Sequence, residues 1–338
     1  MILGGGVAGL SAAICARRAG WDAVVVERRE RGETSARNAH VHRLPLESQA
    51  QLAQILSDRV PDDAGPGAPV GAARGGSLVW TGHQPLSCLG ELEARLLRSA
   101  VETGVQVMFA ETAQGLSVAA GAWRLDLDAG STLEADLLID ASGAHRAAFA
   151  LLGDGAPDVP LDDIDAPERH VSWSGRAPAD DPCLIAWSDQ AVEGLLQVAS
   201  NGHVQLTARA GLDADLSLDR AQEALGGAGG DALSRRLRSI RFEPRGVRHT
   251  SPGARRVALD EVDLAALPPL ALIGDALIEA PPRYGEGVGR AIEQAQALGV
   301  MLQEGRAAQC AVELARQAKA HWAGYGVALS LRPHTPAI

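Results

Sequence analysis

Three glycines near the start of the chain, Gly4, Gly6 and Gly9, stand at the spacing G-x-G-x-x-G, after a short apolar run and before an alanine-rich stretch. The first glycine would allow a tight turn, the second would let a pyrophosphate approach the backbone, and the third would let a helix pack closely on the strand. The first turn of that helix, which contains Val7 and Ala8, would offer free N–H groups and a partial positive charge to the phosphates. The spacing therefore predicts a dinucleotide-binding turn.

An acidic residue, Glu27, follows the apolar run at 24–26 and lies 23 residues after Gly4. A carboxylate at the end of the second strand can accept hydrogen bonds from the ribose hydroxyls of an adenine dinucleotide and repel a 2′-phosphate. We assign Glu27 and the adjacent Arg28 to this site. The alternative is a structural strand–helix–strand unit with a glycine-rich turn. Only three residues precede Gly4, so the first strand either is very short or begins upstream.

A second group of glycines and acids lies near the end of the chain. The apolar run 270–273 ends in Gly274 and Asp275, and an amphipathic helix is expected at 290–302. A proline and a Gly-x-Gly stretch lie between the run and the helix, and we assign to a cofactor site Pro282, Gly285, Glu286, Gly287 and Val288. An earlier strand, at 132–139, is followed by Asp140 and Gly143. A buried strand that finishes in Asp and Gly is a place where the backbone can meet a ligand.

In this order, the three motifs resemble those of the flavoprotein monooxygenases of the p-hydroxybenzoate hydroxylase type and of the related geranylgeranyl reductases. The resemblance covers both ends of the chain and implies an α/β fold, in which an antiparallel-sheet substrate domain interrupts a Rossmann-like (GR2-type) FAD-binding domain. By analogy, residues 1–154 and 255–338 would form the FAD-binding domain, with the C-terminal helix, and residues 155–254 the substrate domain. In these families the residue at Asp275 binds the ribityl chain, and the helix beginning near Gly287 faces the flavin pyrimidine edge.

The resemblance also implies an activity. NAD(P)H, bound transiently, would reduce FAD, and O2 would add at flavin C4a to give a hydroperoxide that hydroxylates a small or peptide-borne aromatic substrate. Five side chains are candidates to meet flavin or substrate: Arg37 for the cofactor, and His40, His42, Arg43 and Tyr284 for catalysis. The two histidines would face the same side of a strand, where they could bind substrate or relay a proton. They could equally be ordinary histidines packed at a domain boundary.

Three positions depart from the family pattern. Ile278 stands where a histidine is common, Glu286 where a glutamine is common, and Leu89 where an arginine begins the helix. Glu286 matches the reductase branch, so the alternatives are an FAD-dependent reductase or dehydrogenase and a degenerate flavoprotein without activity. A flavin halogenase fits poorly, because such enzymes use an active-site lysine and the single lysine of this chain, Lys319, lies in an expected C-terminal helix.

The composition limits the possible partners. Among 338 residues, 42 acidic and 31 basic side chains give a net charge of −11, which disfavours nonspecific binding to nucleic acid or an anionic membrane. We see no membrane-spanning apolar run and no secretory signal, so we expect a cytoplasmic protein with a small-molecule substrate. The cysteines have no metal-ligand or disulfide spacing, and no metal site is predicted. Substrate identity, nicotinamide preference, covalent attachment of FAD and oligomeric state stay open.

The segments between the motifs predict the remaining elements. An amphipathic helix is expected at 89–103, and residues 61–76, which are rich in proline, glycine and alanine, are expected to form a loop. In the insert, short alternating runs predict an antiparallel sheet. Two helices at 217–225 and 231–238 are expected, with the glycine run 226–230 as a linker between them.

Overall fold

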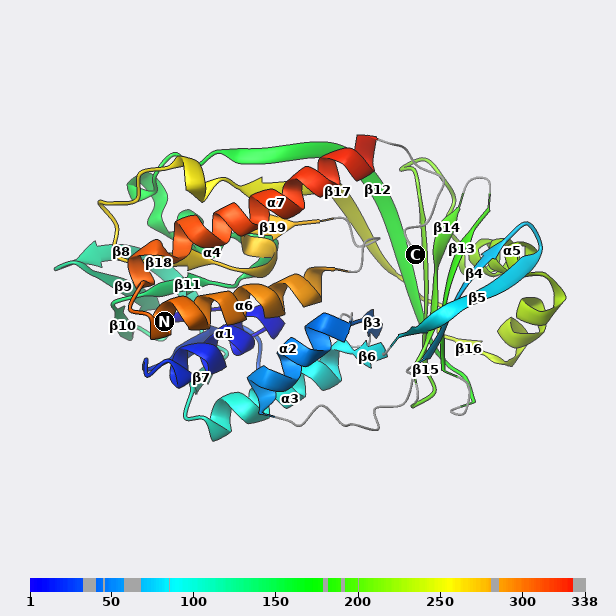
Figure 1. Cartoon of the computed structure of the whole chain (residues 1–338), viewed down its shortest axis with the longest axis horizontal. Coiled ribbons are helices and arrows are strands. Elements are labelled where there is room, and N and C mark those ends of the chain that lie inside the picture. The colour runs from blue at the N-terminus through cyan, green and yellow to red at the C-terminus, as the bar shows by residue number, and fades with distance from the viewer. Residues whose placement is uncertain are drawn as a thin grey trace.

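Figure 1 shows an elongated molecule with a helix-covered parallel sheet at one end and a large, mostly antiparallel sheet at the other. The computed structural model describes residues 1–32, 41–44, 46–57, 68–84, 86–178, 182–189, 192–199, 201–280 and 286–330. The two sheets have separate buried apolar clusters, so the chain builds one core at each end of the molecule.

Five short parallel strands of the described chain form the sheet that carries the glycine motifs. Its order is β18 (Leu270–Leu272), β11 (Leu138–Asp140), β1 (Ile2–Leu3), β2 (Val24–Glu27) and β7 (Gln106–Phe109). Each neighbouring pair is parallel. The strands that precede the predicted ligand-binding turns therefore all end at the same edge of the sheet.

Helices from both ends of the chain cover this sheet. On one side lie α1 (Val7–Arg18), α2 (Leu46–Leu56), α3 (Leu89–Glu102), α6 (Gly287–Gln303) and α7 (Cys310–Ser330). Small side chains let α1 and α6 approach closely, because a Cβ built on Gly299 would lie 2.8 Å from the Cβ of Cys15. Leu10 and Ile14 supply the buried face of α1, and Gly20, at φ +87°, follows its end.

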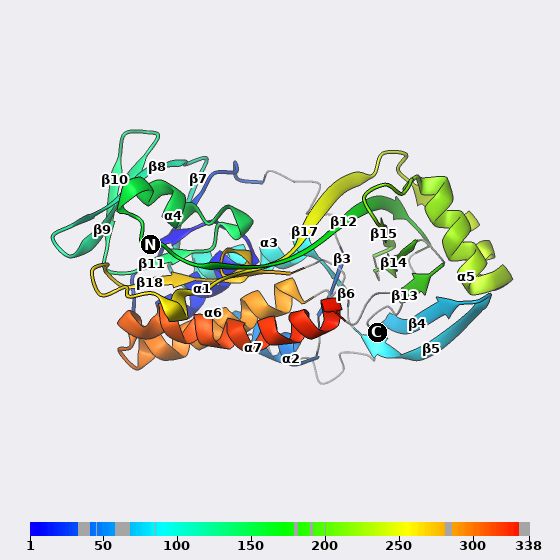
Figure 2. The ribbon, with the colours of Figure 1, turned by 90° about the horizontal axis from the view of Figure 1, so that it is seen from above.

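The other side of the parallel sheet carries a small antiparallel sheet and a short helix (Figure 2). These elements are β8 (Ala113–Ala119), β9 (Ala122–Leu127), β10 (Thr132–Ala135) and α4 (Ala147–Leu152). Alternation along β9 buries Trp123, Leu125 and Leu127. The Trp123 Nε1–H donates to the carbonyl oxygen of Pro269 at 2.8 Å, which fastens the small sheet to the start of β18.

The large sheet combines strands from three parts of the chain. Its order is β19 (Ile278–Glu279), β17 (Val247–Val257), β12 (Leu161–Arg176), β15 (His203–Ala210), β14 (Glu193–Val198), β13 (Cys183–Ser188), β4 (Ala68–Arg74) and β5 (Ser77–Gln84), with β16 (Arg241–Phe242) beside β12. Pairing is antiparallel except between β13 and β4. The long strands β12 and β17 run from one half of the molecule into the other.

One face of the large sheet is apolar and packs on α5 (Leu218–Ser239). Along β12, Val171 and Trp173 point to this face, and Leu225 of α5 is buried against it. Because side chains alternate along a strand, Glu168 and His170 of β12 lie on the opposite face. Figures 1 and 2 both show α5 on the outer side of the sheet, so the opposite face is turned toward the helix-covered half.

Of two expectations about glycine-rich segments, one was wrong and the other was confirmed only in part. The expected loop at 61–76 contains strand β4, in which a Cβ on Gly71 would lie 2.9 Å from the Trp80 ring, so the small residue makes room for the neighbouring strand. The glycine run 226–230 is a linker only at Gly230, where φ is +71° and the helical backbone is interrupted, so the two expected helices are present within α5 but the first continues through 226–229. Small residues here permit close packing rather than flexibility.

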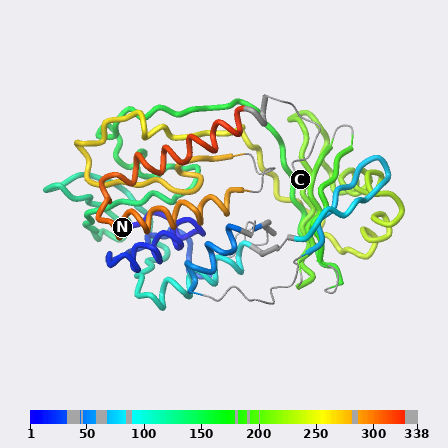
Figure 3. The backbone as a smooth tube through the Cα atoms, viewed as in Figure 1, coloured from blue at the N-terminus to red at the C-terminus, as the bar shows by residue number. Residues whose placement is uncertain are grey.

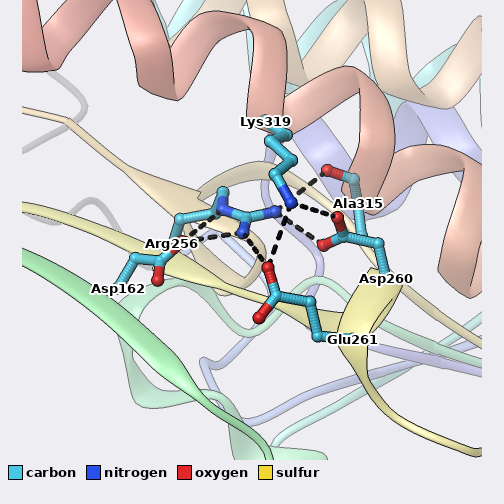
Figure 4. A network of polar contacts seen from close by, with 6 residues as sticks. All are labelled: Asp162, Arg256, Asp260, Glu261, Ala315 and Lys319. Carbon is cyan, nitrogen blue, oxygen red and sulfur yellow. Dashed lines mark hydrogen bonds and ion pairs between the residues drawn. The ribbon is translucent and has the colours of Figure 1, made fainter.

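A buried arginine ties the long strands to the C-terminal helix (Figure 4). Arg256 of β17, with 1% of its side chain exposed, donates from Nε to Asp162 Oδ2 of β12 at 2.8 Å and from Nη1 to Asp260 Oδ1 at 2.7 Å. Its Nη1 also faces the carbonyl oxygen of Ala315 in α7 at 3.4 Å. Lys319 of α7 donates to Asp260 Oδ2 at 3.2 Å. The single lysine is therefore part of a structural ion-pair network.

Candidate functional site

The three N-terminal glycines have different environments. Gly4 has φ +98°, and a Cβ there would lie 2.6 Å from the carbonyl oxygen of Ala141. A Cβ on Gly9 would overlap the carbonyl oxygen of Gly4. Among the described residues, in contrast, a Cβ on Gly6 would have no backbone neighbour within 4 Å, and its nearest heavy atom would be Glu93 Oε1 at 3.6 Å. The backbone of the turn therefore requires glycine at positions 4 and 9. At position 6 the missing side chain leaves free space in front of the turn.

This open turn fits a phosphate group. Gly6 is the N-cap of α1 and makes no side-chain capping bond, so the first N–H groups of the helix, at Val7 and Ala8, are not capped by it. An uncapped helix N-terminus with no Cβ in front of it can donate to an anion and has a favourable dipole. The geometry of residues 4–9 is thus the one expected of a dinucleotide pyrophosphate cradle.

The Glu27 side chain forms hydrogen bonds with the same turn and with Arg29. Its Oε2 accepts hydrogen bonds from Gly5 N at 2.7 Å and from Arg29 Nη2 at 3.0 Å, and its Oε1 accepts from Arg29 N at 2.8 Å. Burial alone would raise the pKa of Glu27, but the hydrogen bonds from Arg29 and Gly5 and the charge of Arg29 outweigh burial and lower the pKa. The carboxylate therefore stays ionised beside the turn, while the predicted Arg28 is exposed.

Asp140 has a structural role at the end of β11. Its Oδ1 accepts from Ser142 N at 2.9 Å and Ser142 Oγ at 2.6 Å, and its Oδ2 accepts from Ala148 N at 2.9 Å. Burial raises the pKa of Asp140, against the lowering effect of these hydrogen bonds. Gly143, at φ +74°, continues the turn. Asp140 thus fixes the backbone that faces Gly4.

The two glycine-rich motifs meet in space. A Cβ on Gly274, which has φ +63°, would lie 3.1 Å from the Cβ of Ala8, in the first turn of α1. Gly274 N donates to the buried Gln294 Oε1 of α6 at 2.6 Å, so the second turn is fastened to the helix that follows it. A Cβ on Gly287 would lie 3.8 Å from Asp275 Oδ1. Figure 3 shows the first and last parts of the chain side by side.

The start of α6 carries an arginine that sequence reasoning missed. Arg290 is 5% exposed, its guanidinium lies 5.2 Å from the centre of the Tyr325 ring, and its Nε and Nη1 have no hydrogen-bond partner within the described chain. Tyr325 Oη donates to Glu286 Oε2 at 2.8 Å. A buried, unsatisfied guanidinium near a helix N-terminus favours a bound anion. The available signal in the sequence was a charged residue in the first turn of a helix whose buried face is mostly apolar.

A second missed group lies on the inward face of the large sheet. Arg209 of β15 contacts Glu168 at 3.2 Å and forms a close ion pair with Glu193 of β14. His170 is 4% exposed, and its Nε2 is 3.4 Å from Glu168 Oε2, an ion-pair distance without hydrogen-bond geometry. Glu193 Oε1 is buried and unbonded among the described residues. The alternation of these residues along their strands signals a shared face, but sequence does not show which strands pair.

Several predicted site residues lie outside the description. Arg37, His40, Pro282, Tyr284 and Gly285 fall in the ranges that the structure does not describe. His42 and Arg43 lie in strand β3 (Val41–Arg43), which pairs antiparallel with β6 (Leu86–Cys88). Strand β6 leads directly into α3, so the backbone of these two residues lies near the start of that helix. Val288 lies in the first turn of α6. The roles assigned to these residues stay predictions.

The described residues contain no group of three or more His, Cys, Asp or Glu side chains arranged to hold a metal ion. No helix among the described residues is long and apolar enough to cross a membrane.

Comparison with known proteins agrees with the geometry of the first turn. The family model described as FAD dependent oxidoreductase matches residues 1–84, which include the glycine turn, Glu27 and α2. No curated protein sequence matches the chain.

Solved structures define the class of fold. The chain is similar to a flavoprotein/dehydrogenase from Cytophaga hutchinsonii, with 16% identity and a TM-score of 0.72 over 94% of this chain and 82% of that one. It is also similar to a variant of Klebsiella pneumoniae HpxO complexed with FAD (20% identity, TM-score 0.68, 94% and 84% covered) and to the flavin-dependent brominase Bmp2 (15%, 0.69, 96% and 82%). The chain therefore has the α/β fold of these flavoproteins, as predicted.

Proposed function

We propose that this protein is an FAD-dependent oxidoreductase that acts as a monooxygenase on a small aromatic substrate. The observation that carries the proposal is the contact between the two glycine turns, in which Gly274 lies against Ala8 at the N-terminus of α1. FAD is an extended dinucleotide and would contact both glycine turns at once. A nucleotide bound by the first turn alone would give no reason for the second turn to lie beside it. The match of residues 1–84 to the FAD dependent oxidoreductase family supports the same cofactor.

In this proposal the first turn binds the AMP half of FAD. The N–H groups of Val7 and Ala8, with the room left by Gly6, would receive the pyrophosphate. Glu27 would accept hydrogen bonds from ribose hydroxyls with the lone pairs that Gly5 and Arg29 do not use. Arg37, which the structure does not describe, remains a candidate for the same half.

The second turn and the start of α6 bind the flavin half. Asp275 would bind the ribityl chain, and the first N–H groups of α6, at Gly287 and Val288, would face the pyrimidine edge. The buried charge of Arg290 adds to the positive potential there. When bound, FAD would supply the oxidation chemistry, with NAD(P)H as reductant and O2 as co-substrate.

The substrate would enter from the side of the large sheet. The inward face carries His170, Arg209, Glu168 and Glu193, buried polar groups able to orient a substrate and to hold a proton. His40, His42, Arg43 and Tyr284 are proposed to line the same space. A buried polar face of this kind would exclude bulk water from the reaction.

An FAD-dependent reductase is the second candidate, because Glu286 matches that branch and is held by Tyr325 at 2.8 Å. Halogenation is disfavoured, although the fold resembles a brominase. Lys319, the single lysine, is fixed by Asp260 and Glu261 in the network of Figure 4, outside the glycine turns.

The test combines two readouts on one purified sample. The protein is loaded with FAD and supplied with NADH or NADPH and a panel of phenols, and O2 uptake is followed together with incorporation of isotopically labelled oxygen into product. A monooxygenase incorporates the label. Reduction of an added alkene without labelled product would favour the reductase, and a protein that takes up no FAD would support the non-catalytic alternative.

A further inference from the structure

An acidic side chain lies at the mouth of the phosphate cradle. Glu93 belongs to α3, which packs on α1, and 18% of its side chain is exposed. Its Oε1 is the nearest heavy atom to a Cβ built on Gly6, at 3.6 Å. The carboxylate is therefore next to the space that the second glycine keeps free.

The Glu93 carboxylate also forms an ion pair with Arg29. Arg29 contacts Glu93 Oε2 through Nη1 at 3.4 Å and Glu27 Oε2 through Nη2 at 3.0 Å. One guanidinium is thus shared by two carboxylates. A pyrophosphate arriving at α1 meets a carboxylate that already competes for Arg29 and for the positive end of the helix.

We infer that Glu93 weakens FAD binding and makes the flavin an exchangeable cofactor that the protein takes up from solution and releases again. This inference rests on the proposed function. Glu93 lies beside the space that Gly6 leaves free, and a carboxylate there would repel the pyrophosphate and raise the dissociation constant of FAD by about tenfold relative to a neutral side chain.

The experiment is titration of flavin-free protein with FAD, followed by calorimetry and by flavin fluorescence. Glu93→Gln should lower the dissociation constant by about tenfold because it removes a negative charge from the cradle, and Glu93→Arg should lower it further because it also adds a positive charge. Glu102→Gln is the matched control, since Glu102 is an exposed residue at the far end of the same helix, and its dissociation constant should equal that of the wild type.

Salt gives an independent readout. If the effect is electrostatic, the ratio of wild-type to Glu93→Gln dissociation constants should shrink as NaCl is raised. Far-UV circular dichroism and urea midpoints establish that each variant folds. If Glu93→Gln does not fold, Glu93→Ala is measured in its place.

The outcomes are distinguishable. A Glu93→Gln variant that binds FAD no tighter than the wild type, or more weakly, overturns the inference while leaving the proposed function intact. If wild type and all variants fail to bind FAD, the proposed function itself is wrong.

Discussion

At the scale of single residues, the glycines of the first turn separate folding from binding. Gly6→Val should leave the free energy of unfolding within about 1 kcal/mol of the wild type but abolish FAD uptake, because the new side chain fills the open cradle and its Cβ has no backbone atom of the described chain within 4 Å. Gly9→Val should instead destabilise the fold by several kcal/mol (roughly 3 or more), because its Cβ would overlap the Gly4 carbonyl. Urea unfolding and FAD absorbance after gel filtration measure both quantities. A Gly6→Val protein as yellow as its parent would show that the N-terminal assignment is wrong.

Glu27 predicts a pH dependence whose sign follows from its lowered pKa. A carboxyl whose pKa is lower in the folded protein stabilises the fold above its unfolded pKa, near the ordinary value of 4.5, and loses that contribution as the pH falls through the folded pKa. Glu27→Gln should therefore cost about 1–3 kcal/mol near neutral pH, and the cost should shrink well below pH 4.5. Urea midpoints at a neutral and an acidic pH test this. An equal cost at both would mean that the charge of Glu27 is unimportant.

At the scale of elements, the kink in α5 depends on one glycine. Gly230→Ala should destabilise the protein by about 1–3 kcal/mol, because residue 230 has φ +71° and a Cβ there would lie 2.6 Å from the Gly76 carbonyl oxygen. Gly227→Ala, three residues earlier in the same helix with open space around it, should stabilise by about 0.5–1 kcal/mol. Thermal unfolding compares the two. Equal effects would indicate that the backbone strain at 230 is not decisive.

The sequence predicted elements well where periodicity was strong. The amphipathic pattern at 89–103 gave α3, and the apolar run before Glu27 gave β2. It failed where small residues serve packing, as at Gly71 in β4 and in the middle of α5, because glycine-rich composition is the same for a loop and for a closely packed element. The pairing of β13 with the distant β4 depends on long-range contacts that local pattern does not encode.

In the candidate site too, sequence pattern indicated the local features and missed those that depend on long-range contacts. The glycine spacing and Glu27 were readable because their chemistry is local to one strand–helix–strand unit. Arg29, Glu93 and Arg290 were missed, since a charged side chain gains meaning only from the atoms it meets after folding. Glu93 lies 87 residues beyond Gly6 in sequence and reaches the first turn only because α3 packs on α1.

At the scale of the whole molecule, Arg256 fastens the long strands β12 and β17, which run from one half into the other, to the C-terminal helix α7. Arg256→Met should destabilise the protein by about 3–5 kcal/mol, because it leaves the buried carboxylate of Asp260 without its main partner. Arg255→Met is the matched control, since Arg255 is more exposed and 3.6 Å from Asp163, and it should cost less than about 1 kcal/mol. Urea unfolding curves decide. An equal decrease of the free energy of unfolding in both variants would show that the network of Figure 4 stabilises the fold no more than an exposed ion pair does.

The proposed function depends on one extended cofactor that contacts both the first and the last segments of the chain. The most direct measurement is hydrogen–deuterium exchange of the full-length protein with and without FAD. We predict that FAD slows exchange in two separate peptides, one covering residues 4–9 and one covering residues 274–288, with little change in α5. Protection of the first peptide alone, or of neither, would contradict a shared FAD site.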